Sequence, residues 1–346
     1  MKLRSLYFDG PGRVSIHENT IRRPCQNEVL VKTLFSGISA GTELLVFKGE
    51  WPSELTLDQS ISALSGKFSY PVKYGYAAVG RVIEVGEDLS PEWTGKLVFA
   101  FNPHETYFLS SAENLIIIPE GVAPEVACLL PNMETAVNLV MDGNPIIGES
   151  VAIFGQGIVG ILTTALLSRM SLAKVVTFEK YPARRQASLS MGADLSVDPS
   201  TDFGISRFDD FFVGSLGDDG RADLTYELSG RPEVLNMAIA ITGYGGRIVV
   251  GSFYGSKKSP IELGGWFHRS RIKLISSQVS SVAPHLTARW SKKRRLEFAL
   301  RMLAQIKPEG LITHIKSFED VSEAYQLLND KPQETIQVIL SYEENA

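Results

Sequence analysis

Residues 151–160, VAIFGQGIVG, join an apolar run to three closely spaced glycines, and this stretch constrains the fold most strongly. Gly155, Gly157 and Gly160 form a G-x-G-x-x-G pattern directly after a predicted strand and at the start of a predicted helix. In that context the first glycine permits a tight turn, the second lets the backbone approach a pyrophosphate, and the third allows close helix–sheet packing. The N–H groups at the helix start face the anion. The stretch therefore predicts a dinucleotide-binding β-α-β unit.

An acidic residue follows at the position that such a unit requires. Glu179 stands nineteen residues after Gly160, at the end of the next predicted strand. A carboxylate there can accept hydrogen bonds from the adenosine ribose and would repel a 2′-phosphate, which favours NAD over NADP. Lys180, with Arg184 and Arg185 close by, keeps NADP open as an alternative. A glycine turn with only a packing role is the competing interpretation, and the strand, helix and acidic residue in register argue against it.

A later strand of the same sheet completes the predicted cofactor site. The segment GGRIVVGSF (245–253) ends near Gly251 and Ser252, which would approach the nicotinamide end of the crevice. The residues that we expect to bind the cofactor from these segments are Gly155, Gln156, Gly157, Ile158, Val159, Gly160, Glu179, Lys180, Gly251 and Ser252.

The pattern of apolar and polar residues changes near Glu134. Before it, short alternating runs broken by glycine and proline predict an all-β, barrel-like region. After it, continuous apolar strands alternate with helical segments, which predicts a parallel sheet covered on both faces. The expected helices are at 135–143, 157–172, 182–193, 232–242 and 292–306, and a closing strand is expected in ETIQVILSYE (334–343).

Composition excludes several classes of protein. A chain of 346 residues with 44% hydrophobic and 21% charged residues suits two globular domains. The net charge of −5 gives no argument for a nucleic-acid or membrane partner, and we interpret the basic run 289–295 as a solvated helix face rather than a polyanion site. Two cysteines, no apolar run of 18 residues and no signal-peptide pattern predict a cytoplasmic protein without a four-cysteine zinc site.

Four segments in order resemble the medium-chain dehydrogenase/reductase superfamily, which includes alcohol, sorbitol and threonine dehydrogenases. They are GISAGTE (37–43), YGYAAVGRVIEVG (74–86), GQGIVG (155–160) and MGADLSVD (191–198). The resemblance implies an α/β fold. It comprises a GroES-like β-barrel catalytic domain at 1–133 plus 284–346 and a Rossmann domain with a doubly wound parallel sheet at 134–283, with the active site between them. PHE (103–105) and PNMETAVN (131–138) narrow the resemblance to a bacterial branch that includes bacteriochlorophyllide dehydrogenases.

The positions of the catalytic zinc ligands are altered in this sequence. Zinc members of the superfamily use a cysteine in a GICGTD-like stretch, a histidine in GHE, and a third cysteine or acidic residue before the central domain. The resemblance places Ser39 or Ala40 at the first position, Tyr76 at the second and Pro131 at the third, with Ala77 for the glutamate of GHE. Catalytic zinc needs three nitrogen, sulfur or oxygen ligands and an open fourth position. We therefore predict no zinc and no other metal.

A rebuilt metal site from Glu43, His104 and Glu134 is the alternative that we weighed against this prediction. Glu134 has two further interpretations, as a structural hydrogen-bond acceptor or as a general base. We favour the structural role, because buried carboxylates need partners more often than they perform chemistry.

Without zinc, a protein group must stabilise the oxygen that gains charge during hydride transfer. Tyr76 is the first candidate, because its position otherwise carries a ligand that points into the cleft; a packed barrel tyrosine is the alternative. His104 is the second candidate, with a structural histidine as its alternative. The resemblance implies that Thr42 corresponds to a hydroxyl used in proton relay and that Thr135 corresponds to a threonine that contacts the nicotinamide.

The function predicted from these residues is a zinc-independent NAD(P)-dependent oxidoreductase that acts on a small alcohol or carbonyl substrate. Two alternatives remain open: NADPH-dependent reduction of an activated C=C bond, and nucleotide binding by a sensor without turnover. The loop Glu50–Tyr70, with Trp51 and Phe68, is expected to line the substrate cleft. By analogy with the family, RIKLISSQV (271–279) would pair edge to edge in a homodimer.

Overall fold

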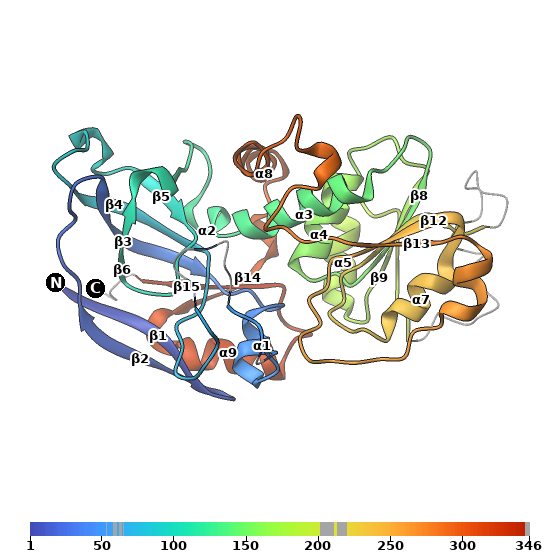
Figure 1. The fold of residues 1–346 in the computed structure, drawn as a ribbon, viewed down its shortest axis with the longest axis horizontal. Helices are drawn as coiled ribbons and strands as arrows, with labels where there is room; N and C mark the ends of the chain where they lie inside the picture. Colours follow the sequence, from blue (N-terminus) through green and yellow to red (C-terminus); the bar gives the residue numbers. More distant parts are fainter. Residues whose placement is uncertain are drawn as a thin grey trace. The chain divides into compact units, whose positions relative to one another are not determined.

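The computed structural model describes residues 1–52, 54–57, 61, 64, 66–200, 211–212 and 220–342 (Figure 1). The chain divides into two compact units, Met1–Pro131 with Leu300–Ala346, and Asn132–Ala299. The predicted domain boundary at 283/284 stands before helix α8 (Lys292–Ile306), whereas the unit boundary falls within that helix. Parts of the predicted substrate loop, residues 53, 58–60, 62–63 and 65, lie outside the described residues.

The first unit consists mainly of antiparallel sheet. A seven-stranded sheet has the order β14-β15-β3-β4-β5-β7, with β6 paired to β3, and β1 and β2 form a separate hairpin. All its pairings are antiparallel except the one between β14 and β15. The strands are β1 (Lys2–Gly10), β2 (Arg13–Thr20), β3 (Glu28–Gly37), β4 (Ala78–Val85), β5 (Leu97–Ala100), β6 (Tyr107–Ser111), β7 (Ile116–Ile117), β14 (Ile312–Ser317) and β15 (Gln337–Ser341).

Short helices cover one part of this sheet and share its core. Helix α9 buries Tyr325 and Leu328 in the same apolar cluster as Phe8 of β1 and Phe47 of α1. Burial of such side chains is the main favourable term in folding the unit. The helical segments are α1 (Glu43–Lys48), η2 (Pro91–Trp93), η3 (Ala112–Asn114), α2 (Pro124–Ala127), η6 (Glu309–Leu311), η7 (Phe318–Asp320) and α9 (Val321–Asp330).

The second unit is built on a six-stranded sheet in which every pairing is parallel. The strand order is β10-β9-β8-β11-β12-β13, so the chain proceeds outward from β8 in one direction and then returns to continue on its other side. The strands are β8 (Ser150–Phe154), β9 (Lys174–Phe178), β10 (Leu195–Val197), β11 (Ala222–Glu227), β12 (Thr242–Val250) and β13 (Lys273–Ser276).

Helices lie on both faces of this sheet. Alternate residues of β8 separate into two cores: Ala152 and Phe154 pack with helix α7, whereas Val151 and Ile153 pack with residues of α3 and α4. This confirms the predicted α/β fold class with a doubly wound parallel sheet. The helices are α3 (Leu130–Gly143), α4 (Ile158–Leu167), α5 (Pro182–Ser190), α7 (Val234–Ile241), the π-helical turn η4 (Leu263–Phe267), η5 (Pro284–Leu286) and α8. Within the described ranges, none of the helices has the length and apolar character needed to cross a bilayer.

A charged clamp secures the edge of this sheet at which β8 begins. Arg247 of β12 binds both carboxylate oxygens of Glu149 at 2.7 Å and also donates to the carbonyls of Gly143, the last residue of α3, and of Asn144. Burial alone would raise the pKa of Glu149, but hydrogen bonds from Arg247 and the Ile146 amide, with the charge of Arg247, hold this pKa below its usual value. The clamp therefore contributes stability when Glu149 is ionised.

Substitution of Glu149 by glutamine should lower the free energy of unfolding at pH 7 by about 1–2 kcal/mol, because charge-assisted hydrogen bonds become neutral ones. A lowered folded pKa stabilises above the unfolded value and loses this contribution as pH falls. The difference between the native chain and Glu149→Gln should thus shrink below pH 4.5, the ordinary value of the carboxyl. Urea unfolding between pH 7 and pH 3 measures both effects.

The matched control is Glu84→Gln. Glu84 lies 3.7 Å from Arg23 in an exposed pair, so this change should alter the free energy of unfolding by less than about 0.5 kcal/mol. If the difference in free energy of unfolding between the native chain and Glu149→Gln did not depend on pH, the stabilising role of the ionised Glu149–Arg247 pair would be contradicted.

Candidate active site

The glycine turn after β8 is tightly enclosed on one side and open on the other. Gly155 has φ +87°, and a Cβ there would lie 2.6 Å from the Ser229 Cα. A Cβ at Gly160 would lie 2.0 Å from the Gly155 carbonyl oxygen, whereas one at Gly157 would meet no described atom within 4 Å. Gly157 is extended and stands directly before α4. The backbone at Gly157 is therefore accessible to a ligand at the start of a helix, as an anion site requires.

The side chain of Gln156 anchors this turn to the helix that follows. It is fully buried, donates to the Gly155 carbonyl at 3.1 Å and accepts from the Thr164 hydroxyl of α4 at 3.1 Å. Ile158 is buried and Val159 is half-buried in the first turn of α4. The side chains of these predicted cofactor residues thus shape the turn, and the backbone presents the N–H groups.

Glu179 connects the end of β9 to the same turn. Its carboxylate is buried and accepts from the Gln156 amide at 2.9 Å and from the Tyr181 amide at 3.0 Å. Two cations face the Tyr181 ring, with Lys180 Nζ 4.6 Å and the Arg184 guanidinium carbon 5.2 Å from its centre. Burial lowers the pKa of Arg184, and the charge of Glu179 opposes this change. An acidic group and two cations therefore meet where the adenosine end of a dinucleotide is expected.

The second half of the predicted cofactor site lies at the ends of β11 and β12. The Gly251 amide donates to the Glu227 carbonyl at 3.1 Å, and the Ser252 hydroxyl accepts from the Gly230 amide at 2.9 Å. The Leu228 amide donates to the Phe154 carbonyl at 2.8 Å, so this loop adjoins the glycine turn. The strand order reverses between β8 and β11, and ligands of such sheets bind at that switch point.

A buried carboxylate that was not among the predicted site residues lies at this switch point. Glu227 ends β11 and accepts from the Ser229 amide at 2.9 Å, from the Ser229 hydroxyl and from the Tyr254 hydroxyl. Burial, followed by the charge of Glu227, raises the pKa of Tyr254, so its hydroxyl is a neutral donor. The signal available in the sequence was an acidic residue at the end of the apolar segment DLTYELSG (223–230), which is typical of a parallel strand. Thr135, the remaining predicted cofactor residue, is half-buried on α3.

In the first unit, two of the predicted catalytic residues belong to one group of hydroxyls. The Tyr76 hydroxyl donates to Ser39 Oγ and lies 3.4 Å from Thr42 Oγ1. All three side chains are half-buried. We call Ser39, Thr42 and Tyr76 the hydroxyl cluster. The sequence analysis named Ser39 only as a candidate metal-ligand position, so its hydrogen bond to Tyr76 was missed.

His104, the other predicted catalytic residue, is completely buried. Its Nδ1 lies 2.6 Å from Ser36 Oγ and its Nε2 lies 3.0 Å from Glu43 Oε2. The same carboxylate accepts from the Tyr325 hydroxyl of α9. Burial, followed by the charge of Glu43, raises the pKa of Tyr325 well above its usual value, so the phenol is a neutral donor. No local sequence signal connects Tyr325 to this group.

Comparisons with known proteins agree along almost the whole chain. A family model described as zinc-binding dehydrogenase matches residues 159–296. D-guloside 3-dehydrogenase of Escherichia coli K12 is 25% identical over 360 residues, which cover 98% of this chain and 100% of that protein. The 2-desacetyl-2-hydroxyethyl bacteriochlorophyllide A dehydrogenase of Rhodobacter capsulatus is 23% identical over 361 residues, 99% of each chain. These matches support the resemblance of this chain to the medium-chain dehydrogenase/reductase superfamily.

These matches confirm the predicted resemblance and the assignment to the oxidoreductases. A solved alcohol dehydrogenase, RspB of Escherichia coli CFT073 in complex with NADH, superposes with a TM-score of 0.77 at 20% identity and covers 99% of both chains. At that identity the likeness shows the fold, a GroES-like domain and a Rossmann domain. The residues matched by the family model, 159–296, contain none of the three ligand positions discussed above, so its description does not bear on zinc.

The side chains present do not fit the catalytic zinc of the superfamily. Ser39 and Tyr76 bind each other, and Pro131 lies in the first turn of α3. In the part of the chain that the structure describes, no three His, Cys, Asp or Glu side chains form a group that could hold a metal ion. Two of the residues in the alternative metal site, Glu43 and His104, instead bind each other.

Glu134, the third residue of the alternative metal site, has a structural partner. It is buried and accepts from Arg295 Nε at 3.1 Å and Nη2 at 2.9 Å. Burial raises the pKa of Glu134, and the charge and hydrogen bonds of Arg295 oppose the rise. Arg295 is itself fully buried and also donates to Asn138. This arrangement accords with the structural role that we favoured for Glu134.

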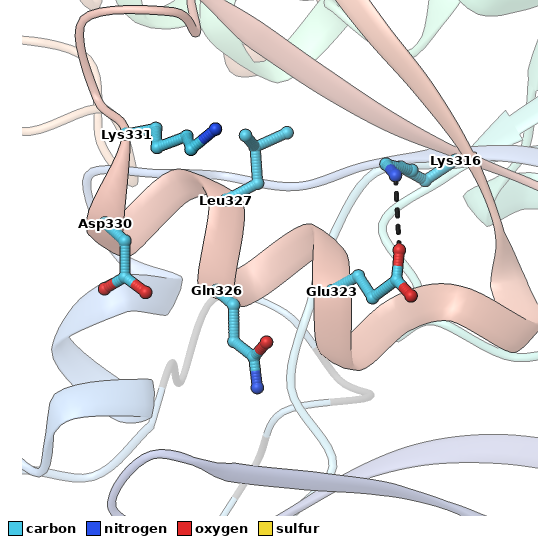
Figure 2. Close-up of a pocket in the computed structure, with 6 residues that line it drawn as sticks. All are labelled: Lys316, Glu323, Gln326, Leu327, Asp330 and Lys331. Carbon is cyan, nitrogen blue, oxygen red and sulfur yellow. Dashed lines mark hydrogen bonds and ion pairs between the residues drawn. The ribbon is translucent and has the colours of Figure 1, made fainter.

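A surface groove in the first unit is lined by six residues (Figure 2). It has a volume of about 270 Å³, and the labelled side chains project from β14, from α9 and from the residue directly after α9. One ion pair, between Lys316 and Glu323 at 3.3 Å, spans part of it. None of the residues predicted to bind cofactor or perform catalysis lines this groove. Its lining residues are Lys316, Glu323, Gln326, Leu327, Asp330 and Lys331.

Proposed function

We propose that this protein transfers hydride between NAD and a small alcohol or carbonyl substrate, and does so without zinc. The observation that supports this most directly is the bond between Tyr76 and Ser39. The resemblance places Tyr76 at one metal-ligand position of the zinc enzymes and Ser39 or Ala40 at another, and here Tyr76 and Ser39 form a group of hydroxyls instead. The intact glycine turn in the second unit supports the cofactor part of the proposal.

The residues around the glycine turn fit a nicotinamide dinucleotide. The accessible backbone at Gly157 would hold the pyrophosphate, and Glu179 would accept from the adenosine ribose. Gly251 and Ser252, with Thr135 of α3, would contact the nicotinamide end. When bound, this cofactor supplies or accepts the hydride. Glu179 favours NAD over NADP, because a carboxylate repels a 2′-phosphate, although Lys180 and Arg184 reduce this preference.

The hydroxyl cluster would supply the proton and stabilise charge. A carbonyl oxygen that gains negative charge needs a hydrogen-bond donor or a proton. Tyr76 is the proposed donor, since a phenol is neutral at pH 7 and can both donate and accept. The single O–H of Tyr76 donates to Ser39 Oγ in the structure and would turn to the substrate oxygen when substrate binds, with the Ser39 hydroxyl then donating to the phenol oxygen. Thr42, 3.4 Å from the Tyr76 hydroxyl, would orient the substrate oxygen. In the opposite direction the same groups would accept the proton of an alcohol.

Cofactor titration followed by a substrate panel tests the proposal. Quenching of tryptophan fluorescence should give a dissociation constant for NADH at least about tenfold lower than that for NADPH. Chelator-treated protein should then oxidise NADH with at least one member of a panel of aldehydes and ketones. Activity that disappears on chelation and returns with Zn²⁺ would contradict the proposal.

Two other outcomes would identify the alternatives. Tighter binding of NADPH, with turnover confined to enones and quinones, would indicate reduction of a C=C bond. Binding of NADH without hydride transfer to any member of either panel would indicate a sensor.

We also propose that the chain forms a homodimer through β13. This strand is last in the order of the parallel sheet, and its residue Leu274 is 45% exposed. An exposed strand edge of this kind is a site for pairing with a second copy. Sedimentation equilibrium would test the assembly, with twice the chain mass of 38.0 kDa expected.

Cys25 and Cys128 are both free thiols, which is consistent with the predicted cytoplasmic location.

A further inference from the structure

His104 connects three segments that are far apart in the sequence. Its Nδ1 lies 2.6 Å from Ser36 Oγ at the end of β3, and its Nε2 lies 3.0 Å from Glu43 Oε2 at the start of α1. Its ring also packs directly against Gly75, which has φ +116°, and a Cβ on Gly75 would lie 2.5 Å from His104 Cδ2. A carboxylate only accepts hydrogen bonds, so Nε2 is the donor in the pair with Glu43.

Glu43 fixes the turn that carries two members of the hydroxyl cluster. Its carboxylate accepts from the Ser39 amide at 2.7 Å, from His104 and from the Tyr325 hydroxyl. Its own amide donates to the Ser39 carbonyl at 2.8 Å, which closes residues 39–43 into one turn. The side chain is completely buried, and a buried carboxylate is stable only when donors of this kind surround it.

The two sides of the hydroxyl cluster therefore depend on one buried pair. Ser39 and Thr42 belong to the turn that Glu43 holds, and Tyr76 follows the glycine that packs on His104. The bond between Tyr76 and Ser39 forms only when both segments are in place. Residues 39–42 and Tyr76 are also the segments that a shared zinc ion would connect in zinc members of the superfamily. Here the connection is made by hydrogen bonds and packing.

We propose that Glu43 and His104 are positioning residues that hold the Tyr76 hydroxyl in its catalytic place, a role that rests on the function proposed above. Neither would contact the substrate, because both side chains are fully buried beneath the half-buried hydroxyl cluster. Loss of the pair should displace Tyr76, and displacements of about 1 Å cost about a hundredfold in rate.

The deciding variant is His104→Gln, with exposed His285→Gln as the matched control. A glutamine can bind Glu43 or Ser36 but lacks the rigid ring that reaches both. We expect kcat with the best panel substrate to fall about 10- to 100-fold, while the dissociation constant of NADH changes less than about twofold. In protein labelled with 3-fluorotyrosine, the ¹⁹F resonance of Tyr76, assigned from Tyr76→Phe, should shift. His285→Gln should change none of these.

A folded His104→Gln protein with unchanged kcat and an unchanged Tyr76 resonance would overturn the proposal. If this variant does not fold, Tyr325→Phe decides, because it removes one donor to Glu43 and keeps the ring that packs against Phe8 and Phe47. It should lower kcat about three- to tenfold and shift the Tyr76 resonance, and no change in either would refute the role. If the panel yields no substrate, the proposed function fails, and the ¹⁹F resonance alone still tests the positioning.

Discussion

Substitution of Gly155 by alanine should destabilise the nucleotide-binding unit by about 2–4 kcal/mol and eliminate measurable binding of NADH. The backbone at φ +87° costs a residue with a side chain about 1 kcal/mol. The new Cβ would also lie 2.6 Å from Ser229 Cα and 2.7 Å from the Leu228 carbonyl group, which are backbone atoms that cannot rotate away. Displacing that loop adds about 1–3 kcal/mol. Urea unfolding and fluorescence titration measure the two effects.

Gly157→Ala is the informative partner of this variant. Its added Cβ meets no described atom within 4 Å and the backbone is extended, so the free energy of unfolding should stay within about 0.5 kcal/mol. Affinity for NADH should nevertheless fall at least about tenfold, because the methyl group occupies the side of the turn that a pyrophosphate approaches. Equal NADH affinity in Gly157→Ala and the native chain would show that the nucleotide does not bind here.

The second large effect is expected at Tyr76. Tyr76→Phe should lower kcat about 100-fold and leave the dissociation constant of NADH within about twofold, because a proton donor acts in the transition state rather than in cofactor binding. The ring and its packing remain, so the melting temperature should change little. Steady-state kinetics with the best panel substrate, together with thermal unfolding, measure these quantities.

Tyr74→Phe is the matched control for this experiment. Tyr74 lies two residues before Tyr76, and its ring packs edge-on against Tyr76 at 6.2 Å and against Trp51 at 5.6 Å. Tyr74 is only 2% exposed, whereas Tyr76 is half-buried and belongs to the hydroxyl cluster. Loss of a hydroxyl from Tyr74 should therefore lower kcat less than about threefold. A larger loss of kcat in Tyr74→Phe than in Tyr76→Phe would contradict the assignment of Tyr76 as the proton donor.

Local sequence patterns predicted most of the elements, and the differences have physical causes. The amphipathic run 292–306 was predicted as a helix, and α8 has these bounds. Helix α3 was predicted from residue 135 but begins at Leu130. Pro131 lies in the first turn of this helix, where a proline is tolerated because its missing N–H has no intrahelical partner. Strand β1 was not predicted individually, although its residues lie within the region predicted to be all-β.

In the candidate site, too, some features could be predicted from local sequence patterns and others could not. The positions of the glycine turn between β8 and α4 and of Glu179 directly after β9 could be predicted, because spacing within one β-α-β unit determines both. The partners of the hydroxyl cluster could not, because Tyr325 is 282 residues from Glu43 and the contact depends on how α9 packs. The hydrogen bonds at both ring nitrogens of His104 could not be predicted from the sequence either, since Ser36 is 68 residues away. Pairings at such separations follow from tertiary packing rather than from local pattern.

On the proposed function, the carboxylate of Glu179 also limits how a change of coenzyme could evolve. Each of its oxygens already accepts a backbone amide, one from the glycine turn and one from the start of the loop before α5. A residue in place of Glu179 that accommodates the 2′-phosphate of NADPH would leave the buried Gln156 amide without its acceptor. The glycine turn that is proposed to bind the diphosphate would then be less rigid. Preference for NAD over NADP and the shape of the glycine turn are therefore coupled. A change from one coenzyme to the other would require changes in both.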